Sequence, residues 1–398
     1  MNTAIENRDY VIFLEGRWDA VSAKDEQARL KECVSKMPED CESIVLDATG
    51  LTYLSSSGIR VLMALAKSAT KPVSLRNVSL EVYEVLDLTG MTQILNVRKA
   101  LRRLSVEGCR LVGEGAMGKV YQLDQDTVVK VYTCPPEEAE KLVEKERLNA
   151  RLAIVHGIPT ALPYDKVLVD GKFGSVFELV NASTFHSLVL EQPDRMEQTI
   201  RRYTDLLKFL HGIDMENADL PSARELFLRK LDFIRDMLPE RLARRMRELL
   251  QALPEDHHMI HGDYQMKNVM LSGDEPILID MDGLSMGQGI FDLQSLCVTY
   301  VLFGEDDPKN PETFLQMSPE MVDAVWRLIL KNYFEGANPE SLARWEDEIR
   351  AVASVRFLEL LKILRLDSGE LGALRIRHTA EHLEDILGRI DRLCSWQP

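Results

Sequence analysis

The segment Ile260–Met270 holds two side chains whose types and spacing suggest chemistry on a phosphate. Asp263 can accept a hydrogen bond from a substrate hydroxyl and orient that hydroxyl in line with the phosphorus atom. Asn268, five positions later, offers a neutral amide oxygen, and Mg²⁺ takes only one or two such ligands from a protein because it keeps most of its waters. Taken singly, Asp263 could be a turn residue and Asn268 a cap. Their assignment therefore needs support from other segments.

The segment Pro276–Asp282 supplies acidic side chains at the end of a short apolar run. Such a run predicts a strand that delivers Asp280 at its end, where a carboxylate can bridge a metal ion and phosphates. Asp282 lies two positions further and points the same way, but Asp280 is the preferred ligand because it terminates the strand. Either acid alone could be an ordinary loop residue. It is improbable that all four residues, Asp263, Asn268, Asp280 and Asp282, have only such ordinary roles.

Three glycines, Gly113, Gly115 and Gly118, lie between two predicted strands. Because glycine has no Cβ atom, it allows backbone N–H groups to close over phosphates. The same GxGxxG spacing occurs in dinucleotide-binding units, but there the third glycine opens a helix, whereas residues 119–123 have a strand-like pattern. A tight hairpin without a ligand is the alternative for this loop taken alone. The strand-loop-strand context favours a phosphate-binding loop of the kinase type.

Lys130 lies in the next strand, among β-branched and aromatic neighbours. A lysine in that position must reach solvent or be held by a carboxylate. In the helical pattern that follows, Glu146 shares one face with the apolar Val143 and Ala150. We expect Glu146 to pair with Lys130, because such a pair positions the lysine against the phosphates of ATP, and Glu144 is the second choice. Otherwise Glu146 is a partly exposed residue of an ordinary helix.

The elements that must position these residues fall into two domains, as the length of 398 residues suggests. Residues 10–97 alternate strands and helices and predict a small α/β domain. Short apolar strands are expected at 11–14, 44–46 and 73–75. We place the boundary near residue 105, where a locally basic segment precedes the glycine-rich region. The expected domains are therefore residues 1–104 and 105–398.

The second domain divides by pattern into two lobes. Residues 109–180 mix strand-like runs with one long helical stretch from Glu137 to Val155, which predicts a β-rich lobe at about residues 105–180. From Met196 onward amphipathic helical patterns dominate, so a mostly helical lobe is expected at about residues 181–398. The segments that carry Asp263 and Asp280 interrupt these helices as short strands and loops.

The composition argues against several classes of protein. A net charge of −16 works against binding to nucleic acids or to anionic membranes. The N-terminal residues lack the apolar core of a signal peptide, and the longest apolar stretches are too short to span a bilayer. We therefore expect a soluble, cytoplasmic protein. Six cysteines without CxxC spacing fit neither a zinc site nor a dense disulfide framework. We expect reduced, mostly structural thiols at Cys33, Cys41, Cys109, Cys134, Cys297 and Cys394.

Three motifs together resemble the aminoglycoside phosphotransferase and choline kinase branch of the protein-kinase-like fold. They are HGDxxxxN at 261–268, IDxD at 279–282 and GxxDL at 289–293. The resemblance spans roughly residues 106–398 and implies a two-lobed fold with ATP in the cleft. It implies that His261 supports the loop, Asp263 is catalytic, Asn268 and Asp280 bind Mg²⁺, Lys130 contacts phosphates, and residues 177–180, including Glu178 and Val180, form the adenine-contacting hinge.

Two departures from this family leave the class of substrate open. The loop at 113–118 is closer to protein kinases than to many antibiotic kinases. Gln265 and Lys267 replace the residues that are commoner in the loop. We expect an acceptor that carries a hydroxyl, on either a small molecule or a protein.

Three serines, Ser55, Ser56 and Ser57, precede a predicted helix in the small domain and can cap it. A phosphate on Ser56 would lie at the positive end of that helix and would change what the surface binds. The region resembles the STAS domain of anti-sigma-factor antagonists over about residues 8–104. In that family the serine that aligns with Ser56 is phosphorylated, whereas Ser55 stands where aspartate is usual.

Two functions are compatible with these features. The first is an active, ATP- and Mg²⁺-dependent phosphotransferase whose STAS module provides regulation or docks a protein partner. The second is a STAS-based regulatory binding protein whose kinase-like half only binds nucleotide or phosphorylates the STAS serine. The presence of every expected catalytic residue favours the first: Lys130, Glu146, Asp263, Asn268 and Asp280.

Overall fold

The computed structural model describes residues 1–115 and 118–393, and contacts between its Cα atoms divide the chain into two units. The first unit holds Met1–Ser105 and the short segment Val167–Gly171, and the second holds Val106–Lys166 and Lys172–Pro398. The boundary between residues 104 and 105 stays a prediction. In the part of the chain that the structure describes, no helix has both the length and the apolar character needed to cross a lipid bilayer.

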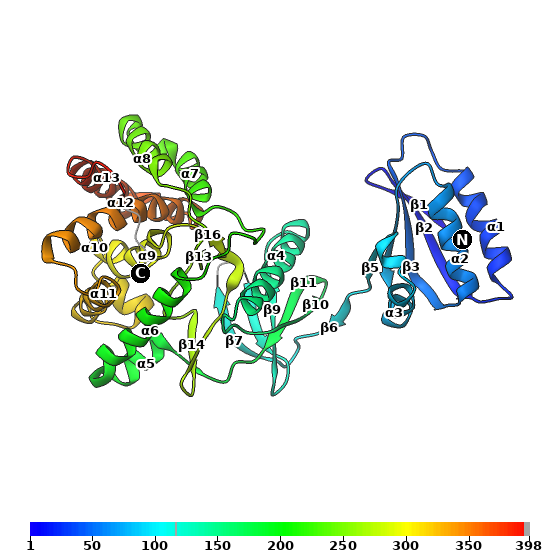
Figure 1. Cartoon of the computed structure of the whole chain (residues 1–398), viewed down its shortest axis with the longest axis horizontal. Coiled ribbons are helices and arrows are strands. Elements are labelled where there is room, and N and C mark those ends of the chain that lie inside the picture. The colour runs from blue at the N-terminus through cyan, green and yellow to red at the C-terminus, as the bar shows by residue number, and fades with distance from the viewer. Residues whose placement is uncertain (116–117, 394–398) are drawn as a thin grey trace. The chain divides into compact units, whose positions relative to one another are not determined.

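The first unit is a five-stranded sheet with three helices (Figure 1). The strand order is β1-β2-β3-β4-β5, with β1 antiparallel to β2 and the remaining neighbours parallel. Helical crossovers supply the connections that parallel strands require. The three predicted strands are confirmed within β2, β3 and β4, whereas the exposed edge strands β1 and β5 were not predicted. The elements are β1 (Thr3–Glu6), β2 (Asp9–Trp18), α1 (Ala23–Ser35), β3 (Ser43–Leu54), α2 (Ser56–Ser68), β4 (Val73–Val78), α3 (Leu80–Leu88) and β5 (Asn96–Lys99).

The second unit begins with a β-rich lobe in which β7, β8, β9 and β11 form antiparallel neighbours. Helix α4 packs against β11, as Figure 1 shows. Gly118 begins a strand and not a helix, so the dinucleotide-binding alternative is wrong. The elements of this region are β7 (Arg110–Gly115), β8 (Gly118–Gln122), β9 (Thr127–Tyr132), α4 (Pro136–Val155) and β11 (Lys172–Glu178). The strand β6 (Arg102–Leu104) belongs to the first unit, and β10 (Pro163–Val169) is divided between the two units.

The helical lobe surrounds a large apolar core that includes Tyr203, Leu293 and Phe357. Several of its helices begin at a side-chain cap, such as Ser222, Ser318 and Asn338. The helices are α5 (Phe185–Glu191), α6 (Met196–His211), α7 (Ala223–Phe233), α8 (Glu240–Ala252), α9 (Ile290–Cys297), α10 (Phe303–Glu305), α11 (Pro319–Tyr333), α12 (Pro339–Ile363) and α13 (Gly369–Leu387).

Short strands interrupt these helices where the sequence predicted them, and they carry the candidate site. They are β12 (Ser183–Thr184), β13 (Met259–Ile260), β14 (Val269–Ser272), β15 (Glu275–Leu278) and β16 (Ser285–Met286). Strand β15 ends two residues before Asp280, earlier than predicted. Asp280 has φ +63°, in the left-handed region, so it cannot continue an extended strand.

Candidate active site

The loop between β13 and β14 is anchored by Tyr264. This side chain is fully buried, and its hydroxyl donates to the carbonyl oxygen of Tyr203 over 2.7 Å. In return the Tyr203 hydroxyl donates to the Tyr264 carbonyl oxygen over 3.1 Å, and the two rings stack with centroids 4.6 Å apart. This reciprocal pair fixes the backbone immediately after Asp263.

Two amide side chains hold the Asp263 carboxylate. Gln265 Nε2 donates to Oδ1 over 2.8 Å, and Asn268 Nδ2 donates to Oδ2 over 3.2 Å. Asn268 Nδ2 also donates to the Asp263 carbonyl oxygen over 3.0 Å. Because its amide nitrogen is bound to Asp263, the side-chain oxygen of Asn268 is the atom available to a cation. The sequence did not predict the contact between Gln265 and Asp263, although Gln265 was identified as a departure from the commoner residue in this loop.

Asp292, on α9, anchors the backbone of the same loop. Its carboxylate accepts hydrogen bonds from the backbone N–H groups of His261, over 2.9 Å, and Gly262, over 2.7 Å. It also lies 3.1 Å from His211 Nε2, and His211 Nδ1 lies 2.7 Å from the Tyr333 hydroxyl. Sequence reasoning assigned no role to Asp292 or His211. An acid within the apolar run 290–293 was the available signal, since a buried carboxylate requires donors.

His261 joins the loop to the segment that carries Asp280. Its Nε2 lies 3.3 Å from the Ile279 carbonyl oxygen, and its Nδ1 accepts from the Asp263 backbone N–H over 3.3 Å. These two contacts fit the tautomer with the proton on Nε2. Because backbone groups engage both ring nitrogens, His261 positions the loop.

The two loops approach through their backbones at glycines. Gly262 has φ +84°, and a Cβ atom there would lie 2.4 Å from the Gly283 carbonyl oxygen. A Cβ atom on Gly283 would lie 2.7 Å from the His261 carbonyl oxygen. Any side chain at these positions would force the loops apart, so the glycines are needed to bring the Asp263 and Asp280 segments together.

The hairpin β14–β15 brings Asn268 close to Asp280. Val269 pairs with Leu278, and the Ile279 backbone N–H donates to the Asn268 carbonyl oxygen over 2.9 Å. Asp280 therefore follows directly on the residue bonded to Asn268. This register explains how two segments that are separate in the sequence can offer oxygen atoms to one cation.

Lys130 connects α4 to the Asp280 segment. Its ammonium donates to Glu146 Oε1 over 3.0 Å and to Asp280 Oδ1 over 2.6 Å. Burial alone would lower the pKa of Lys130, but the charges of Glu146, Asp280 and Asp282 outweigh burial and raise it. The predicted pairing of Lys130 with Glu146 is confirmed, and the second choice, Glu144, instead bonds Lys166.

Asp282 adds negative charge next to Asp280. Burial, followed by repulsion from Asp280, raises the pKa of Asp282. Asp280 remains more open, with 38% of its side chain exposed. Within residues 1–115 and 118–393, no group of three or more His, Cys, Asp or Glu side chains is arranged to hold a metal ion. A cation here would therefore depend on a mixed set that includes the amide oxygen of Asn268.

A cavity of about 460 Å³ lies next to the predicted hinge. It is bounded by β7, the end of β8 and the segment Leu179–Ala182, which includes Val180. Glu178 precedes this segment, and its backbone N–H donates to the Leu162 carbonyl oxygen over 3.0 Å. Gly113 and Gly115 lie on β7 and Gly118 begins β8, while Ala116 and Met117 lie outside the described residues. The cavity is thus lined by the two strands that the glycine loop joins, at the end of their hairpin opposite Gly115 and Gly118.

Ser56 lies in the first unit as the exposed first residue of α2. The cap of that helix is Ser55, whose side chain accepts hydrogen bonds from the backbone N–H groups of Ser57 and Gly58. A serine cap is therefore confirmed, and the Ser56 hydroxyl is not the group that provides it. Five cysteines are free thiols, whereas Cys394 lies outside the described residues.

Residues 108–318, more than half of the chain, match the family described as "Phosphotransferase enzyme family". The chain belongs to this family. The match contains the glycine loop, Lys130, the Asp263 loop and the Asp280 segment, and it assigns the two-lobed second unit to the kinase-like phosphotransferase fold. Residues 1–102 match the family described as "Mlab, STAS domain", so the phosphotransferase unit follows a STAS domain. No curated protein matches the chain.

Solved structures of phosphotransferases resemble the chain at low identity. The ADP-bound aminoglycoside phosphotransferase APH(2'')-Ib has 14% identity and a TM-score of 0.47, over 70% of this chain and 94% of its own. A choline/ethanolamine kinase family protein from Mesorhizobium loti has 16% identity and a TM-score of 0.45, over 70% of this chain and 87% of its own. A type VIII aminoglycoside-3'-phosphotransferase has 19% identity and a TM-score of 0.43, over 64% and 93%.

Proposed function

We propose that this phosphotransferase transfers the terminal phosphate of ATP, with Mg²⁺, to a hydroxyl group of a small molecule or a protein. One observation carries the proposal. Lys130 bonds both Glu146 and Asp280, while Asp263 is held by amides on a loop whose backbone contacts the Asp280 segment. Groups suited to phosphates, to a cation and to a hydroxyl therefore meet in one place.

Each residue has a defined task in this proposal. The Asp263 carboxylate accepts the hydrogen bond of the acceptor hydroxyl and orients its oxygen toward the terminal phosphorus. Lys130 and the backbone of the glycine loop neutralise and hold the phosphates. Asn268, Asp280 and Asp282 would hold Mg²⁺, which offsets the charge of the phosphates. Glu178 and Val180 would contact the adenine beside the cavity at the hinge.

We assign the STAS domain a role in regulation or in docking a protein partner, and we place the protein in the cytoplasm. The five free thiols support that location. The net charge of −16 supports a partner other than nucleic acid or membrane. The alternative is a regulatory protein whose second unit only binds nucleotide. The ordered contacts on Asp263 favour turnover over binding alone, because nucleotide binding has no need of them.

A screen of acceptors tests the proposed function. Wild-type protein would be incubated with ATP and Mg²⁺ against amino alcohols, sugars, aminoglycosides and a no-acceptor control that reports autophosphorylation. We expect ADP formation to depend on Mg²⁺ and to rise with at least one acceptor or to label the protein itself. Binding of ATP with no transfer to any acceptor or to protein would favour the binding-only alternative.

A second candidate reaction is phosphorylation of Ser56 by this chain, within one molecule or between two. Ser56 is exposed, and its hydroxyl takes no part in capping α2. Mass spectrometry after incubation with ATP and Mg²⁺ would detect the phosphate, and Ser56→Ala is the matched control. An unmodified Ser56 after full ATP turnover would remove this candidate.

A further inference from the structure

Tyr132 is a buried tyrosine beside the Lys130 ion pair. It lies two residues after Lys130 on β9, so both side chains leave the same face of the strand. Its ring packs with Ala139 and Val143 of α4, and only 2% of the residue is exposed. Its hydroxyl donates to Glu146 Oε2, while Lys130 donates to Oε1 of the same carboxylate. Each oxygen of Glu146 therefore has its own donor.

We propose that Tyr132 is a positioning residue for nucleotide binding: its hydroxyl fixes the orientation of Glu146, so that Glu146 holds Lys130 toward the nucleotide phosphates. The inference rests on the proposed function, because that function assigns Lys130 to the phosphates.

The chemistry of the buried carboxylate supports this role. Glu146 is 3% exposed, so an oxygen without a donor would lose hydration without a replacement. Burial, followed by the charge of Glu146, raises the pKa of Tyr132, so its hydroxyl keeps its proton and remains a donor. Lys130 Nζ also lies 5.5 Å from the centre of the Tyr132 ring, within range of a cation–π contact. Tyr132 thus contacts both members of the ion pair.

The position of α4 does not depend on the Tyr132 hydroxyl. Asn149, one turn after Glu146, donates from Nδ2 to the Met281 carbonyl oxygen over 2.8 Å. Ala150 and Ala153 of the same helix are buried in the core of the second unit. Loss of the hydroxyl therefore changes Glu146 and Lys130 while α4 stays docked beside the Asp280 segment.

Tyr132→Phe tests the proposal because it keeps the ring and removes only the hydroxyl. We expect the Kd and KM for ATP, measured with Mg²⁺ by calorimetry and by steady-state turnover, to rise roughly tenfold. We expect kcat to stay within about twofold, because Asp263 is untouched. Tyr164→Phe is the matched control, since Tyr164 is 50% exposed on β10, and we expect wild-type values for it.

The same substitution in a Glu146→Gln background separates positioning from a general structural effect. The ion pair is already lost in that background, so Tyr132→Phe should change the Kd for ATP by less than about twofold. An equal loss of affinity in both backgrounds would overturn the role through Glu146. Unchanged affinity in Tyr132→Phe, with wild type binding ATP, would overturn the role of Tyr132 alone. A wild-type protein that binds no ATP would overturn the proposed function, and this inference with it.

Discussion

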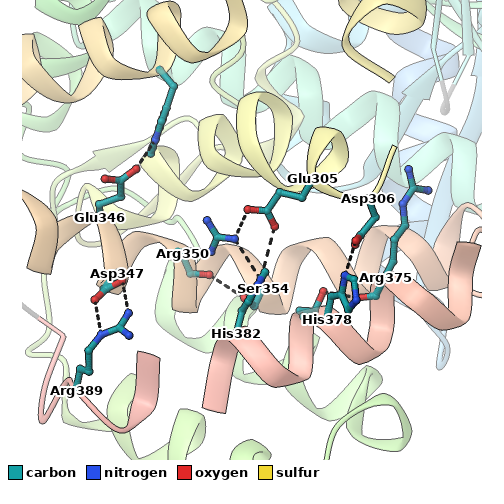
Figure 2. Close-up of polar contacts among 12 residues, drawn as sticks. Glu305, Asp306, Glu346, Asp347, Arg350, Ser354, Arg375, His378, His382 and Arg389 are labelled. Atoms are coloured by element: carbon teal, nitrogen blue, oxygen red, sulfur yellow. Dashed lines mark hydrogen bonds and ion pairs between the residues drawn. The ribbon is translucent and has the colours of Figure 1, made fainter. Parts of the chain in front are cut away.

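Two polar clusters in the second unit differ in the balance of their charges. Around Lys130, one ammonium is shared by Glu146 and Asp280, with Asp282 close by, and the Lys130 side chain is 14% exposed. At the end of α10, on α12, and on and after α13, shown in Figure 2, three acids each contact a basic side chain. The pairs are Glu305 with Arg350, Asp306 with His378, and Asp347 with Arg389.

This difference distinguishes the candidate active site around Lys130 from the ion pairs of Figure 2, which connect helices. A bound divalent cation, as proposed, would offset the excess of negative charge around Lys130, and the buried setting would strengthen that attraction. In the cluster of Figure 2 each of these three acids contacts a basic side chain of its own, and 49% of the Arg389 side chain is exposed, so the cluster ties α13 and the residue Arg389 after it to α12 and to the end of α10. Polar residues alone do not mark a site, but an unmatched buried charge does.

The largest expected effect in this comparison is that of Lys130→Met. The substitution keeps most of the length of the side chain and removes the charge that faces three carboxylates. We expect kcat/KM for ATP to fall by roughly 10³-fold, because the phosphates lose their fixed cation. Steady-state turnover with a coupled ADP assay measures it. A loss below about tenfold would place the phosphate contacts elsewhere.

The next effect is that of Asp292→Asn. The carboxylate accepts from two backbone N–H groups and lies beside His211, and an amide offers one oxygen in its place. We expect the free energy of unfolding to fall by about 3 kcal/mol and turnover to fall roughly 10²-fold as the Asp263 loop loosens. Denaturant unfolding and turnover are measured together. Unchanged turnover in a folded variant would show that the anchor serves stability alone.

A smaller effect is expected for Gln265→Ala, which removes the donor to Asp263 Oδ1. Asn268 still holds Oδ2, so the carboxylate remains but orients the acceptor less well. We expect kcat to fall roughly tenfold with the KM for ATP nearly unchanged. Gln251→Ala, at an exposed position on α8, is the control. A rise in the KM for ATP without a change in kcat would contradict this role.

The smallest effect is expected for Arg350→Ala in the cluster of Figure 2. The guanidinium bonds Glu305 and lies 3.2 Å from His382 Nδ1. We expect turnover within about twofold of wild type and a fall in unfolding free energy of about 1 kcal/mol, because the ion pair is partly exposed and Glu305 keeps its contact with His382. A tenfold loss of turnover would end the distinction between the two clusters.

The sequence predicted the parts of the site that depend on local patterns. The strand of Lys130, the helix of Glu146 and the strands that flank Asp263 follow from apolar periodicity, and the facing of Lys130 and Glu146 follows from the helical stripe. The anchors were not predicted, because Asp292 bonds His261 across 31 residues of sequence and His211 lies beside Asp292 across 81 residues. Local patterns do not report such contacts.

Prediction from local sequence patterns was limited in the same way for the fold. The apolar strands of the first unit were predicted, but β1 and β5 are short edge strands whose residues are mostly exposed, so they lack the alternation that marks a strand. The left-handed Asp280 is another example, since its conformation is imposed by the loop that Lys130 and His261 hold in place.

Asp263→Ala tests the central claim most directly, when ATP consumption and ATP binding are measured on the same preparation. The account predicts that turnover falls by at least about 10³-fold, because the acceptor hydroxyl loses its hydrogen-bond acceptor. It also predicts that the Kd for ATP stays within about twofold of wild type, because Lys130 and the glycine loop keep their contacts with the phosphates. Unchanged turnover in this variant would contradict the account.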